Sequence, residues 1–141
     1  MCRDAISSGG RILRTLCLIL CCTALCSQTL RAQDPEACSA GLWSSQLDTW
    51  CATPFQPADD LCAPGPATTF LGAAGITNTS AAPITFDPTL TLFGATLQSG
   101  GAFEDILASG AAALLNASHP DILYPVDATL VAQLLQDTFS G

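Results

Sequence analysis

The chain has 141 residues and a formal net charge of −8, with four Lys and Arg residues against twelve Asp and Glu residues. All four basic residues are arginines near the amino terminus: Arg3, Arg11, Arg14 and Arg31. Nucleic-acid binding and attachment to anionic lipid both depend on Lys and Arg. The rest of the chain is therefore expected to bind neither nucleic acid nor an anionic membrane surface.

Residues 1–32 are predicted to be a secretory signal peptide. Arginines precede an uncharged apolar run at 16–25, and a short polar stretch follows it. The run is about half of the ~20 residues needed to cross a bilayer, so a permanent anchor is the weaker interpretation. Cleavage after Ala32 is favoured, with Ala24 and Cys26 as alternatives. We expect a secreted, acidic mature chain with a charge of about −11, because it keeps eleven carboxylates and no Lys or Arg.

Residues 33–66 are predicted to form the irregular, Pro-rich amino-terminal segment of the mature domain. Its second half contains four prolines, which forbid regular structure. Its first half, SAGLWSSQLDTW, predicts a short helix with Leu42, Trp43, Leu47 and Trp50 on one side. The seven-residue spacing of Trp43 and Trp50 favours two core anchors. The alternative is a platform on which a sugar stacks.

Three cysteines of this segment, Cys38, Cys51 and Cys62, are predicted to supply one disulfide, because an exported chain tolerates such bonds. The pairing stays open among the three combinations. An odd number implies one free or intermolecular thiol, unless cleavage after Ala24 retains Cys26 as a fourth cysteine. Zinc is disfavoured, since three cysteines and a distant histidine lack finger spacing.

Residues 67–141 are predicted to form the helical remainder of the same domain. A loop is expected to about residue 88, with a helical turn near 69–74. Residues 89–98 fit a strand by their Thr-Leu alternation, or a helix by the spacing of Leu90, Phe93 and Leu97.

Two longer helices are predicted at the end of the chain. The first begins near residue 103 and ends near Ser118, because Pro120 excludes helical geometry from the residue before it. Its Gly110 is expected to let another helix come close. The second is capped by Asp127 and buries one face, made of Leu130, Val131, Leu134, Leu135 and Phe139. The fold class is therefore mainly α: a small helical domain with an irregular, disulfide-stapled amino-terminal segment.

Few residues suggest chemistry, and no catalytic residue is predicted. His119, the one histidine, is interpreted as part of the corner between the two helices rather than as a base acting with Asp121. Asp59 and Asp60 are candidates for divalent-cation binding through oxygen, Ca²⁺ in particular, and no other cofactor is expected. Asn78 and Asn116 each begin an Asn-x-Ser sequence, which is an N-glycosylation signal if the source is a eukaryote.

Three motifs resemble a family of small exported domains of unknown function. The family has a C-x-P-G-Y-W-K-N-H opening, a TLL…L…GGG turn and an AALLNA…YP close. Here the opening is Cys38–Trp43 with Trp50 behind it, the turn runs from Thr91 to Gly101, and the close is Ala112–Ala117 with Tyr124 and Pro125. Ser44-Ser45-Gln46 replaces the family's Lys-Asn-His. The resemblance implies export, a helical domain without assigned chemistry, and a helix at 89–98.

These observations favour a non-enzymatic extracellular module with a structural or assembly role at the cell surface or matrix. Its partners would be other extracellular proteins or further copies of itself. One alternative is a carbohydrate-binding module that uses Trp43 and Trp50. The other is a small secreted hydrolase that uses His119.

Overall fold

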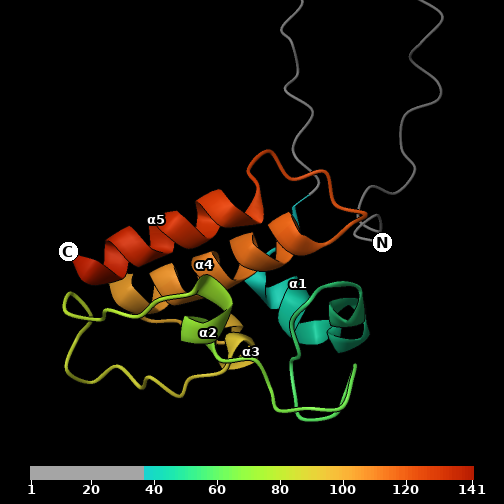
Figure 1. Ribbon diagram of the computed structural model, residues 1–141, viewed down its shortest axis with the longest axis horizontal. Coiled ribbons are helices and arrows are strands. Elements are labelled where there is room, and N and C mark those ends of the chain that lie inside the picture. The colour runs from blue at the N-terminus through green and yellow to red at the C-terminus, as the bar shows by residue number, and fades with distance from the viewer. Residues whose placement is uncertain (1–36) are drawn as a thin grey trace, which may run out of the picture. The chain divides into compact units, whose positions relative to one another are not determined.

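The computed structural model describes residues 37–141, so the predicted signal peptide and its cleavage site lie outside the described residues. The described chain is helical (Figure 1). It contains α1 (Ala40–Ser45), the 3₁₀-helix η1 (Leu47–Ala52), α2 (Phe70–Ala74), α3 (Leu92–Thr96), α4 (Ala102–Ser118) and α5 (Ala128–Ser140). Extended pairing in this part is limited to one antiparallel bridge between Thr69 and Thr91. The predicted mainly α fold class is confirmed.

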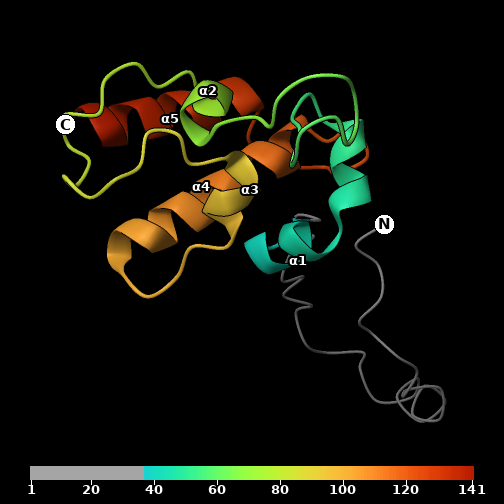
Figure 2. The ribbon, with the colours of Figure 1, turned by 90° about the horizontal axis from the view of Figure 1, so that it is seen from below.

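Helix α4 is the centre of the domain. Helix α5 lies along it, while α1 and α3 pack on α4 and α2 contacts both α3 and α5 (Figures 1 and 2). Gly110 is buried where α4 meets α5, and a Cβ atom at this position would lie 2.7 Å from Cδ2 of Leu135. The predicted role of Gly110 in a close helix approach is confirmed. None of the described helices is both long and apolar enough to cross a membrane.

The helix ends follow local chemistry. The side chain of Asp127 accepts a hydrogen bond from the Leu130 N–H at 3.0 Å and caps α5, as predicted. Thr69 and Thr91 cap α2 and α3 in the same way. Helix α4 ends at Ser118, and His119 already has extended backbone angles before Pro120.

The amino-terminal helix is divided. The short helix predicted from residues 39–50 forms as α1 but does not continue to residue 50, because Gln46 leaves helical geometry at φ −125° and ψ 67°. The chain then continues as the 3₁₀-helix η1. This break aims Trp43 and Trp50 at one another, with ring centroids 6.1 Å apart in an edge-to-face arrangement.

Aromatic rings fill the two ends of the core. At one end lie Trp43, Trp50 and Phe93, and we call these rings the tryptophan end. At the other lie four phenylalanines, and we call them the phenylalanine end: Phe70, Phe86, Phe103 and Phe139. The ring pairs in contact among them have centroids 5.5–5.7 Å apart. Helix α4 links the two ends, because Leu114 and Leu115 are buried near its carboxyl end and Phe103 lies in its first turn.

One face of α5 is not packed as predicted. Val131, Leu135 and Phe139 are buried. Leu130 and Leu134 are 47% and 57% exposed, so their predicted burial is wrong. Helix α5 has two adjoining apolar stripes, one with Leu130 and Leu134 and one with Leu135. Packing against α4 buries only the stripe that contains Leu135.

Candidate functional site

Two polar residues of the described chain are buried, Thr96 and Asn116, and Asn116 on α4 is the more buried at 2% exposed. Its Oδ1 accepts hydrogen bonds from the Cys38 N–H at 2.8 Å and the Trp43 Nε1–H at 3.2 Å. Its Nδ2 donates to the Cys38 carbonyl at 2.9 Å. Asn116 therefore fastens the start of the described chain to α4, across 78 residues of sequence.

These contacts exclude Asn116 as a glycosylation site of the folded domain, although the sequence made it a candidate. Its amide is buried and its nitrogen already donates to a backbone carbonyl, so a folded domain has no space for a sugar on it. The sequence signal for its true role was weak. The sequence placed Asn116 directly after two leucines of the buried helix face, but its hydrogen-bond partners are far away in the chain.

Trp43 and Trp50 are both buried in the core. The Trp50 Nε1–H donates to the Trp43 carbonyl at 2.9 Å, so both indole nitrogens have protein partners. A sugar platform requires an exposed ring face, and neither indole offers one. The carbohydrate-binding alternative therefore does not fit the geometry of this pair.

His119 forms the corner after α4. Its N–H donates to the Leu115 carbonyl, its Nδ1 accepts from the Asp121 N–H at 3.1 Å, and its ring lies 5.9 Å from that of Trp43. All these contacts are with backbone or with an apolar ring. No described carboxylate bonds to the imidazole, so nothing in this geometry orients it as a base.

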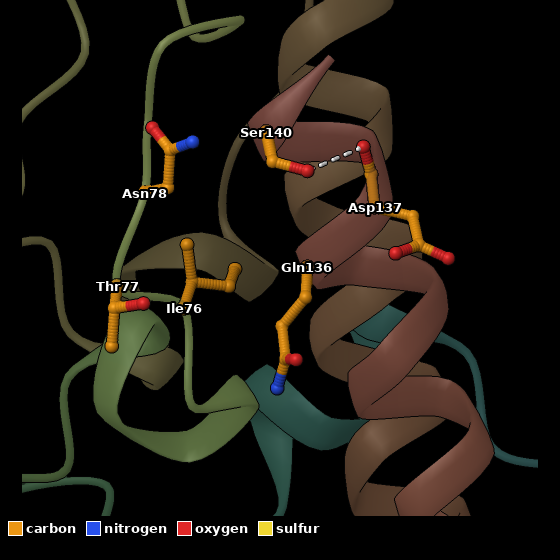
Figure 3. A pocket seen from close by; sticks show the side chains of 6 residues that line it. All are labelled: Ile76, Thr77, Asn78, Gln136, Asp137 and Ser140. Carbon is orange, nitrogen blue, oxygen red and sulfur yellow. Dashed lines mark hydrogen bonds between the residues drawn. The ribbon is translucent and has the colours of Figure 1, made fainter.

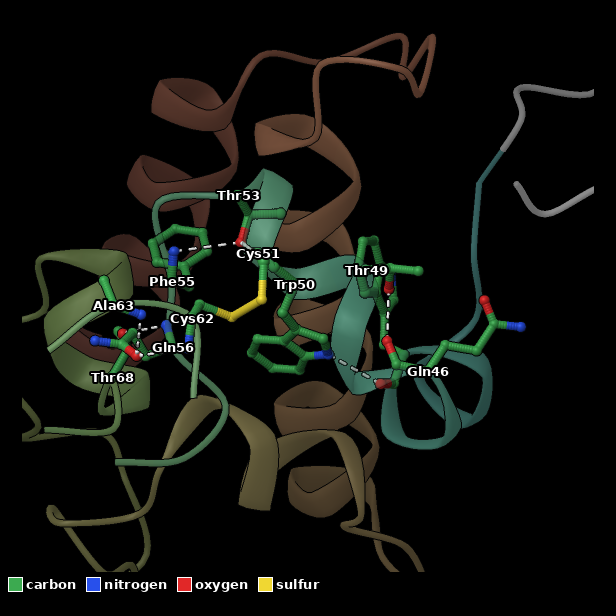
Figure 4. Close-up of a disulfide and its surroundings, with 11 residues drawn as sticks. Gln46, Thr49, Trp50, Cys51, Thr53, Phe55, Gln56, Cys62, Ala63 and Thr68 are labelled. Carbon is green, nitrogen blue, oxygen red and sulfur yellow. Dashed lines mark hydrogen bonds between the residues drawn. A yellow bond between two sulfur atoms is a disulfide. The ribbon is translucent and has the colours of Figure 1, made fainter. Parts of the chain in front are cut away.

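Cys51 and Cys62 form a disulfide that closes part of the Pro-rich segment (Figure 4). This pairing selects one of the three combinations left open by the sequence. Cys38 is also disulfide-bonded. The expectation of a free thiol among these three cysteines is therefore wrong.

The loop behind the disulfide is irregular but well bonded. The Gln56 Oε1 accepts from the N–H groups of Cys62 and Ala63, and the Gln56 N–H donates to the Thr68 hydroxyl at 2.8 Å (Figure 4). Asp59 and Asp60 use their carboxylates in the same loop, accepting from backbone N–H groups of Ala67 and Gly65. These two predicted Ca²⁺ candidates therefore act as loop caps. No group of three or more His, Cys, Asp or Glu residues that could hold a metal ion occurs in residues 37–141.

Asn78 lies in a different structural setting from Asn116. It lies in the exposed loop after α2, and its Oδ1 accepts from the Ser80 N–H at 3.0 Å. This is an Asx-turn, in which the side-chain oxygen copies a backbone turn. The residue is exposed, so Asn78 remains a candidate for glycosylation.

A polar pocket lies between this loop and the last turn of α5 (Figure 3). It has a volume of about 220 Å³ and is lined by Ile76, Thr77, Asn78, Gln136, Asp137 and Ser140. The walls are tied together, since the Gln136 amide donates to the Ala74 carbonyl at 2.8 Å and the Ser80 hydroxyl donates to the Ser140 carbonyl at 2.8 Å. Sequence reasoning missed this pocket, because its two sides are about sixty residues apart.

The second candidate surface is a row of four residues on α5: Asp127, Leu130, Leu134 and Asp137. We call it the leucine stripe. Successive spacings of three, four and three residues place all four on one side of the helix. All four are exposed. The stripe meets the polar pocket at Asp137, which also lines that pocket, while Leu130 and Leu134 lie outside its lining.

Comparisons with protein-family models, curated proteins and solved structures find no match to this chain.

Proposed function

We propose that the protein is a secreted, non-enzymatic extracellular module that binds another protein through the leucine stripe, in a structural or assembly role at the cell surface or matrix. The observation that carries the proposal is the exposure of Leu130 and Leu134 on a helix whose other apolar stripe is fully packed. Two large aliphatic side chains four residues apart are a common anchor pair when one amphipathic helix recognises another.

The charge of the domain indicates the chemistry of the partner. Residues 37–141 carry nine carboxylates and no Lys or Arg. Pairing of two copies through the leucine stripe would bring Asp127 and Asp137 toward the same carboxylates of the second copy, and like charges oppose such contacts. A basic amphipathic helix, with apolar residues flanked by Lys or Arg, meets both the leucines and the carboxylates.

A direct test uses a designed peptide: an amphipathic helix with two leucines four residues apart, flanked by lysines. Binding to the mature protein is measured by calorimetry, beside a peptide with glutamate in place of lysine. The lysine peptide should bind and the glutamate peptide should not. Leu134→Ser should weaken binding about tenfold, which is about 1.4 kcal/mol.

Leu97→Ser is the matched control, because Leu97 is 56% exposed and lies outside the leucine stripe. It should leave binding unchanged. Equal loss in both variants, or dimerisation of the protein without peptide, would contradict the proposed partner.

Export has its own test. The full chain is expressed in secreting cells, and the released protein is measured by intact mass spectrometry. A start near Gln33 is expected from the basic, apolar and polar order of the first 32 residues. An intact Met1 terminus on protein retained in the cytosol would contradict export.

A further inference from the structure

We infer that Asn78, and not Asn116, is an acceptor for an N-linked oligosaccharide, and that the sugar stands at the mouth of the polar pocket beside the end of α5. The two residues share the same sequence signal, Asn-x-Ser. Their structural settings differ, so Asn116 serves as an internal control for Asn78 in the same protein.

The chemistry requires a free amide nitrogen. In the transfer, Nδ2 of the asparagine forms a bond to C1 of the first sugar, the bond from C1 to a lipid-linked diphosphate breaks, and Nδ2 loses one proton. The lipid diphosphate is the leaving group, so no oxidant or reductant is needed. The Nδ2 atom must therefore reach a bulky donor from solvent.

Asn78 meets this requirement. Its Oδ1 is held by the Ser80 N–H at 3.0 Å, which turns the opposite side of the amide, Nδ2, away from its own backbone. The residues on both sides of it, 77 to 81, are exposed. The third residue of the signal, Ser80, supplies the N–H of this turn, and its hydroxyl donates to the Ser140 carbonyl at 2.8 Å.

Asn116 fails the same requirement. Its Nδ2 donates to the Cys38 carbonyl, and its Oδ1 accepts from both Cys38 and Trp43. A sugar on this nitrogen would break the junction between α4 and the start of the described chain.

The place of the sugar follows from the pocket. Figure 3 shows Asn78 on the loop side of the pocket with its amide nitrogen on the side of α5, where Ser140 and Gln136 form the opposite wall. The first sugar, joined to Asn78, would meet hydroxyl and amide groups there. Such groups bond readily to a sugar, and the attached glycan would leave the leucine stripe free at Leu130, two turns or more from Ser140 along α5.

The test expresses the full chain in a eukaryotic secretory cell and maps the secreted monomer by peptide mass spectrometry. Glycosidase release in heavy-oxygen water marks each formerly occupied asparagine as aspartate. We expect the mark at residue 78 and none at residue 116. Asn78→Gln and Ser80→Ala should each remove the glycan, while both remain folded because both positions are exposed.

Two results would overturn the inference. One is a folded, secreted monomer in which Asn78 is unmodified. The other is a folded monomer that carries sugar on Asn116. The control variant Thr79→Ala changes the middle residue of the signal, which the chemistry does not use, and should keep the glycan.

Discussion

The two ends of the core are held by different physics. At the tryptophan end, rings are fixed by directional hydrogen bonds, because Asn116 joins Trp43 to Cys38 and Trp50 bonds to the Trp43 carbonyl. At the phenylalanine end, four rings pack with no polar atom of their own. The first end specifies one geometry for an irregular segment. The second end stabilises regular helices by burying apolar surface, and it tolerates side chains of a different shape.

The largest expected effect is at Asn116. Asn116→Leu keeps the volume but leaves three buried groups without partners: the N–H and carbonyl of Cys38 and the Trp43 indole N–H. Each costs about 1–3 kcal/mol, so the free energy of unfolding should fall by roughly 3–9 kcal/mol. Urea denaturation measures it. Asn78→Leu, an exposed change of the same kind, should cost under about 0.5 kcal/mol.

An equal and small effect of the two asparagine variants would contradict the comparison. It would mean that water replaces the hydrogen bonds of Asn116 without loss of stability. The tryptophan end would then be held by ring packing, like the phenylalanine end.

The next effect is at Phe139, whose ring meets Phe70, Phe86 and Phe103. Phe139→Ala should cost about 3–5 kcal/mol, because it removes a buried ring and leaves a cavity. Phe139→Leu should cost clearly less, since the neighbours need only apolar volume. Thermal unfolding compares both with Leu134→Ala, an exposed change on the same helix that should cost under about 0.5 kcal/mol. If the leucine variant were as damaging as the alanine variant, ring geometry would matter at this end too.

The disulfide has a smaller effect. Replacing both Cys51 and Cys62 by serine removes the disulfide, which links two residues that are eleven positions apart in sequence. The free energy of unfolding should fall by about 3 kcal/mol at most, because the bond mainly restricts the unfolded chain. Peptide mapping without reductant should first show the linked pair in the wild type. A loss well above this limit would mean that the bond also holds Trp50 in place.

The smallest effect concerns Asp87 in the exposed loop before α3. The Thr89 hydroxyl and then the Thr89 N–H donate to its carboxylate, and both hold the pKa of this carboxyl below its ordinary value of 3.8. A lowered pKa in the folded state adds stability above pH 3.8 that is lost as the pH falls through the folded pKa. NMR titration should show the pKa rising in Thr89→Ala and staying low in Thr89→Ser, which keeps the hydroxyl. An unchanged pKa in Thr89→Ala would exclude the hydroxyl as the cause.

The regular half of the fold was predictable because its causes are local. Pro120 ends α4, Asp127 caps α5, and Gly110 marks the helix contact, each within a few residues of its effect. The resemblance to an exported helical family favoured a helix at 89–98, and α3 lies there.

The remaining features depend on distant contacts. Leu130 and Leu135 have the same apolar character and stand on adjoining stripes, so only the position of α4 decides which is buried. Asn116 begins a glycosylation signal in the sequence, and only the packing of the Cys38 backbone against it shows that its side chain is buried and hydrogen-bonded. The polar pocket likewise exists only where the loop after α2 meets the end of α5.

The distance between Cys38 and Asn116 has a consequence for the order of assembly during synthesis. Residues 51 and 62 are close in sequence, so their disulfide can close while the chain is still short. Asn116, the partner of Cys38 and Trp43, is made 78 residues after Cys38 and 73 after Trp43, which at ~5–20 residues per second is a delay of roughly 4–16 s. Through that interval the Trp43 indole N–H has no Asn116 to accept it. The amino-terminal segment is therefore made first and docked late, and a slow codon before position 116 would lengthen the time for which its tryptophans stay outside the core.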